Sequence, residues 1–186
     1  MTTGKKFNNI ILMKHIVTGI VLIFAGAAFF SCQDNDLEER RQAELEKLNN
    51  YIEENYPDLE PTASGLYYIE LEEGTGDSIQ VNDRVQFFFE MLTLDTLTVV
   101  PRNRYEPLEV TVLPPSQLGS SAQSIEQMLG LHEALSYMKK GGKARLILPS
   151  QLAFGQYGNY SVGGFTSLIM EVEVYKVDPF EADDEE

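Results

Sequence analysis

The sequence predicts an α+β domain in which an antiparallel β-sheet packs on one short helix, preceded by a separate N-terminal helix. Two patterns support this class. Residues 167–177 alternate apolar and acidic side chains, which is the period of a half-buried strand. A second set of apolar residues recurs at helical spacing, namely Met128, Leu131, Leu135 and Met138. The chain has 186 residues, of which 43% are hydrophobic, so it is long enough to bury one core.

The N-terminal helix is predicted over Leu37–Tyr56, and Pro57 and Pro61 end it. Its apolar residues form a narrow stripe, Leu45, Leu48, Ile52 and Tyr56, among charged positions. Such a stripe fits docking on the domain or pairing with a second copy, and docking is the favoured interpretation.

The remaining elements follow from strand-like runs and their breakers. Strands are predicted at 66–71, 84–94, 108–113 and 144–148, with a polar Pro/Gly/Ser loop at 114–124. Ser124 followed by Gln127 matches a capping box for the short helix, and Gly141-Gly142 ends it. The acidic tail 178–186 is expected to fray.

The first 31 residues are expected to be an export signal. Lys5, Lys6 and Lys14 precede a 15-residue run, Ile16–Phe30, which is short for a transmembrane helix but typical of a signal peptide. The Ser31-Cys32 junction resembles the lipobox of bacterial lipoproteins, in the looser form of Bacteroidetes. The resemblance implies a lipid on Cys32 and a short tether at 33–36.

As a lipoprotein, the protein is expected in the cell envelope, anchored to the outer membrane on its periplasmic or surface side. An uncleaved membrane anchor or a free cysteine are the alternatives. Translation could begin at Met1 or Met13, and the sequence leaves that choice open.

Charge and composition exclude several functions. The net charge is −15, and removing residues 1–31 leaves 11 basic against 29 acidic residues, a charge of −18. That field repels phosphate backbones, so no nucleic-acid partner is expected. Only one cysteine is present and His132 is the only histidine beyond the signal, so no zinc site, cofactor or Ser-His-Asp triad is expected.

Several motifs, in order, resemble the FKBP family of peptidyl-prolyl isomerases over about residues 64–177. They are Gly65-Leu66-Tyr67-Tyr68, Gly74-Thr75-Gly76, Gly130 to Leu135, Met138 to Ala144, Ile147 to Ser150, Leu152-Ala153-Phe154-Gly155 and Ser167 to Val174. The resemblance implies a twisted antiparallel sheet wrapped on the short helix. It also implies catalysis of X–Pro rotation in an apolar pocket, on a proline-containing peptide or unfolded protein.

The resemblance assigns a site to residues of this chain. Three would carry catalysis: Phe88, Phe154 and Leu131. Six would contact substrate: Leu108, Gln127, Met128, Tyr160, Val162 and Met170.

This sequence departs from the family at the polar positions of that site. Leu131 stands where the family has Trp, and Phe154 stands where it has a hydrogen-bonding Tyr. The family's aspartate falls near Val99, with only Asp95 close by. The Met128 N–H remains as a possible donor, and about ten extra residues fall at 114–124.

The predicted function is therefore an FKBP-type isomerase lipoprotein that assists protein folding, with reduced activity because each lost hydrogen bond weakens binding. One alternative is a catalytically silent FKBP-like module that binds a peptide or protein. Another is a structural surface lipoprotein that assembles through helix 37–56. The oligomeric state is left open.

Overall fold

The computed structural model describes residues 31–102 and 105–181. The chain divides into two compact units, Met1–Arg40 and Arg41–Glu186. The described part of the first unit is the start of helix α2, Ser31–Asn55. Residues 33–36, predicted to be a tether, are therefore helical. The predicted signal run 16–30, the side chain of Cys32 and the tail residues 182–186 lie outside the described residues.

Six antiparallel strands form one sheet. They are β1 Tyr67–Glu72, β2 Arg84–Thr93, β3 Thr98–Val100, β4 Leu108–Thr111, β5 Lys143–Leu148 and β6 Leu168–Asp178. Their order is β1-β5-β6-β2-β3, with β4 also paired to β2. The predicted strands are confirmed, whereas the three-residue β3 was not predicted.

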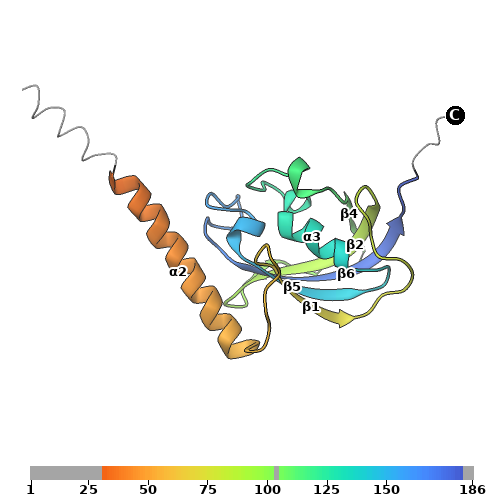
Figure 1. The fold of residues 1–186 in the computed structure, drawn as a ribbon, viewed down its shortest axis with the longest axis horizontal. Coiled ribbons are helices and arrows are strands. Elements are labelled where there is room, and N and C mark those ends of the chain that lie inside the picture. The colour runs from red at the N-terminus through yellow and green to blue at the C-terminus, as the bar shows by residue number, and fades with distance from the viewer. Residues whose placement is uncertain (1–30, 103–104, 182–186) are drawn as a thin grey trace, which may run out of the picture. The chain divides into compact units, whose positions relative to one another are not determined.

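The inner face of the sheet packs on helix α3, Leu129–Tyr137 (Figure 1). Val85, Phe87 and Met91 alternate along β2 and are buried with Leu131 and Leu135 of the helix. Fully burying an aliphatic or aromatic side chain contributes about 1.5–3 kcal/mol, so this layer is the main source of stability. The α+β class predicted from alternation and helical spacing is confirmed.

The outer face of the sheet carries the second half of α2. Leu48 and Ile52 are buried against Ile147 and Ile169, which confirms docking of this helix on its own domain. Glu44 is also buried there. Its carboxylate accepts hydrogen bonds from the N–H and hydroxyl of Ser150, both at 2.6 Å, and from the hydroxyl of Ser167 at 2.7 Å.

Three 3₁₀ turns complete the fold: η1 Pro115–Gln117, η2 Ile125–Gln127 and η3 Ser150–Leu152. The capping box predicted at Ser124 is wrong, because Ser124 precedes η2 and its hydroxyl makes no capping bond. Helix α3 begins only after Met128. None of the helices in the described part of the chain is both long and apolar enough to cross a bilayer.

Candidate functional site

Five of the nine predicted site residues meet in one cluster between the inner face of the sheet and α3. Leu131 is contributed by the helix, Met170 by β6, and Met128 by the turn before the helix. Phe154 and Val162 come from the segment between β5 and β6. The cluster is lined by carbon and sulfur atoms, as the resemblance implied.

These side chains fill the space that they enclose. Leu131, Met128 and Met170 are 0% exposed, Phe154 is 2% exposed and Val162 is 4% exposed. A proline ring therefore reaches none of them without a rearrangement. We call these five residues the buried cluster.

A half-buried apolar rim packs against the buried cluster. Its members are Phe89, Val99, Leu108 and Ile125. Leu108 stands opposite Phe87 in the β2–β4 register, so both side chains share the inner face. The rim is the partly exposed portion of this site.

Phe88 does not join the other two predicted catalytic residues. It lies on the outer face of the sheet, where its ring packs on Tyr175 with centroids 5.6 Å apart. Successive side chains of a strand point to opposite faces, so Phe88 and its neighbour Phe87 face opposite sides of the sheet. Phe87 is the buried aromatic on the helix side.

The predicted polar contacts of the site are engaged elsewhere. The Met128 N–H, expected as a donor to substrate, donates to Ile125 O at 3.1 Å within η2. Gln127 is exposed, and its side-chain oxygen accepts the N–H of Gln123 at 2.9 Å. Asp95 is ion-paired with Lys47 of α2.

The loop after Phe154 separates the two residues predicted in it. Asn159 Oδ1 accepts the N–H groups of Ser161 and Val162, each at 2.8 Å, in an Asx turn. This turn directs Val162 into the buried cluster, while Tyr160 is 99% exposed. Tyr160 contacts a substrate only if that substrate extends over the loop surface.

Residues 118–124, which we call the covering segment, meet the backbone of Phe154 and Gly155 through Ser121. Ala122 is buried in the core cluster, and the Ser121 hydroxyl donates to Phe154 O at 3.3 Å. Gly155 has φ +68°, and a Cβ there would lie 2.9 Å from Ser121 Oγ. The sequence indicated only a polar loop here, because small residues such as Ser121 and Ala122 show no apolar periodicity from which burial could be predicted.

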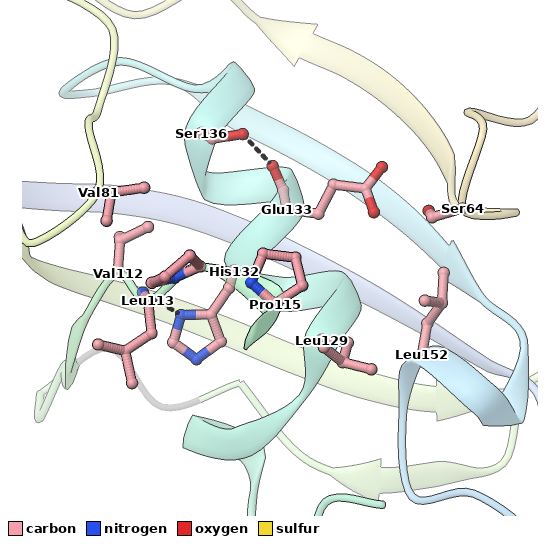
Figure 2. Close-up of a pocket in the computed structure, with 11 residues that line it drawn as sticks. Ser64, Val81, Val112, Leu113, Pro115, Leu129, His132, Glu133, Ser136 and Leu152 are labelled. Atoms are coloured by element: carbon pink, nitrogen blue, oxygen red, sulfur yellow. Dashed lines mark hydrogen bonds between the residues drawn. The ribbon is translucent and has the colours of Figure 1, made fainter. Parts of the chain in front are cut away.

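His132 links two loops to α3 (Figure 2). Its Nδ1 accepts the Leu113 N–H at 3.1 Å, so Nε2 carries the proton and donates to Glu126 O at 2.8 Å. Burial lowers the pKa of the imidazole. His132 is therefore a neutral structural residue and not a catalytic base.

This arrangement, a carbon-lined cluster held between a six-stranded antiparallel sheet and one short helix, defines an FKBP-like domain. The family model described as FKBP-type peptidyl-prolyl cis-trans isomerase matches residues 76–175. The chain belongs to this family.

Individual relatives agree with the family model. The FKBP-type 22 kDa peptidyl-prolyl cis-trans isomerase of Escherichia coli is 30% identical over 146 residues, 75% of this chain and 64% of that protein. The isomerase FkpA of Buchnera aphidicola (subspecies Baizongia pistaciae) is 27% identical over 64% of this chain. The chain spans less than half the length of the FkpA relatives, 43% in this case.

Solved structures show the same fold. A peptidyl-prolyl isomerase from Pseudomonas syringae pv. tomato aligns with a TM-score of 0.60 at 24% identity, covering 76% of this chain and 96% of that chain. Escherichia coli FkpA aligns with a TM-score of 0.61 at 22% identity, covering 88% of this chain and 72% of that chain.

Proposed function

We propose that this protein is a peptidyl-prolyl cis-trans isomerase and folding helper that acts through the buried cluster and its rim. The family match carries the proposal, because it spans residues 76–175 and so includes Leu131, Phe154 and Met170. The ligand is a proline-containing peptide or an unfolded protein segment.

The chemistry requires no nucleophile. The uncatalysed barrier of about 18–20 kcal/mol arises from loss of amide conjugation. A twisted amide separates less charge than a planar one, so transfer to apolar, water-poor surroundings favours the transition state. Leu131 and Phe154 supply that surface in this chain, and Leu108 and Ile125 at the rim position the peptide.

The activity is reduced because the catalytic surface is covered in the resting structure. In this proposal, substrate enters when the covering segment opens and its Ser121 releases the Phe154 carbonyl. If the open form is a minor state, the apparent affinity equals the intrinsic affinity multiplied by the open fraction. Each about 1.4 kcal/mol by which the closed form is more stable lowers that affinity tenfold. The engaged Met128 N–H removes one further contact to the substrate.

A protease-coupled assay of an X–Pro tetrapeptide tests the site. Leu108→Glu places a charge at the rim and should lower kcat/KM about tenfold or more, because the carboxylate resists desolvation. The matched control is Leu71→Glu on β1, where Leu71 is 45% exposed. Equal activity of the two variants would contradict the site assignment.

The second candidate is a silent module that binds the same peptides. The observation in its favour is that no side-chain hydrogen-bonding group belongs to the buried cluster. Chemical-shift changes at Val162 and Ile125 without faster cis/trans exchange of the peptide would favour this candidate over an isomerase.

We also propose that the chain is a lipoprotein of the cell envelope, anchored through Cys32 to the outer membrane. The positive segment, the 15-residue apolar run and the polar switch after Cys32 support this location. Mass spectrometry of the membrane fraction should find an acylated N-terminal Cys32. Cys32→Ser should release the protein from membranes, and retention of that variant would contradict the anchor.

A further inference from the structure

A hollow lies beside α3, where Leu129, His132, Glu133 and Ser136 of the helix line it (Figure 2). Leu131, which belongs to the buried cluster, does not line it. Its volume is about 420 Å³, and its walls are mainly apolar. Seven apolar residues line it: Val81, Val112, Leu113, Pro114, Pro115, Leu129 and Leu152. Ser64, His132, Glu133 and Ser136 complete the lining. We call this hollow the outer groove. None of the five buried-cluster residues or the four rim residues lines it, although Val112, Leu129 and Leu152 also pack in the domain core.

The walls of the outer groove are fixed by hydrogen bonds. Two backbone hydrogen bonds hold Val112 in place. Its carbonyl oxygen accepts the Asn82 N–H at 2.8 Å, and its N–H donates to Asp83 O at 2.9 Å. His132 holds Leu113 from the helix side. The groove is thus formed before any ligand arrives, which lowers the entropic cost of binding.

One carboxylate stands at the edge of these apolar walls. Glu133 is half-buried, and its Oε1 accepts the hydroxyl of Thr62 at 2.8 Å and that of Tyr137 at 3.0 Å. Within the described ranges, no lysine or arginine forms an ion pair with Glu133. The groove therefore offers a fixed negative charge beside apolar surface.

We propose that the outer groove binds a peptide segment in which an apolar side chain stands next to a lysine or arginine. The apolar residue enters the groove between Leu129 and Val112, and the cation pairs with Glu133. The net charge of −15 also favours the approach of basic segments. This site goes beyond the proposed isomerase function, because it requires no proline and uses residues outside the buried cluster and its rim.

The test is a titration of ¹⁵N-labelled protein with two blocked peptides that lack proline. One is acetyl-Ala-Leu-Phe-Lys-Ala-amide, and the other carries Glu in place of Lys. The lysine peptide should shift the amides of Leu129 and Ser136 and bind about three- to tenfold more tightly than the glutamate peptide. Prolyl isomerase activity is measured separately, so the two proposals fail independently.

Two variants and one control complete the experiment. Glu133→Gln should remove the preference for lysine. Val81→Ser should weaken both peptides, because it removes apolar surface from the groove wall without adding a charge, and Val81 is 47% exposed. Glu53→Gln on α2 changes the net charge equally, outside the groove, and should bind as the wild type does. Absence of binding, shifts confined to the buried cluster, or an unchanged preference in Glu133→Gln would overturn the proposal. The two-peptide comparison on wild-type protein decides the question even if a variant fails to fold.

Discussion

Loosening the covering segment should increase isomerase activity. The perturbation is the double substitution Ser121→Ala with Ala122→Gly. Ser121 donates one hydrogen bond to Phe154 O, and that oxygen still accepts the Gly158 N–H at 3.2 Å after the change. No buried acceptor is left unsatisfied. The substitutions should therefore change the equilibrium between the closed and open forms without changing the buried cluster.

The magnitude follows from the lost contacts. The hydroxyl bond is long, at 3.3 Å, and contributes about 0.5–1 kcal/mol. The Ala122 methyl contributes about 0.8 kcal/mol of burial, and glycine adds about 0.5 kcal/mol of chain freedom in the open form. The sum of about 2 kcal/mol raises the open fraction about 20- to 50-fold, and kcat/KM rises in proportion while the closed form dominates.

The assay is the protease-coupled one, run beside thermal melts. Ser120→Ala is the control, because Ser120 is an exposed neighbour in the same segment. The double variant should gain activity while its melting temperature falls by about 4–8 °C, and the control should match the wild type. Unchanged or lower activity in a folded double variant would refute the reasoning that closure limits access.

Two further predictions concern stability. Glu44→Ala removes the acceptor of three hydrogen bonds from Ser150 and Ser167 and should cost about 3 kcal/mol, or about 6–12 °C in melting temperature. The exposed neighbour Glu46→Ala should change the melting temperature little, and equal effects would contradict the role of Glu44. The pKa of His132 is lowered by burial, so the unfolded chain binds a proton more readily, and stability should fall below about pH 6.5 by at most about 1.4 kcal/mol per pH unit. Urea unfolding from pH 7.5 to 5 measures this slope, which His132→Gln should flatten; an identical slope would contradict it.

The sequence predicted the fold where the apolar pattern was periodic. Met128, Leu131 and Leu135 recur at helical spacing and are all buried. Leu48 and Ile52 predicted a docking face, and both contact the sheet. Burial follows from period in these cases, because one face of each element meets the core.

The sequence did not predict side-chain placement where neighbouring residues are alike. Three consecutive phenylalanines, Phe87 to Phe89, do not show which faces inward, and the match to the family chose Phe88. The bond from Ser121 to the Phe154 carbonyl and the burial of Ala122 depend on residues far apart in the chain. Secondary-structure propensity and the spacing of apolar residues do not predict such contacts.

The central claim is that the surface around Phe154 and Leu131 accelerates X–Pro rotation once it is uncovered. Exchange spectroscopy of a proline tetrapeptide measures the cis/trans rate directly, without a coupling protease. We expect a rate above buffer with wild-type protein and a higher rate with the variant carrying Ser121→Ala and Ala122→Gly. Rates equal to buffer for both folded proteins would contradict the claim.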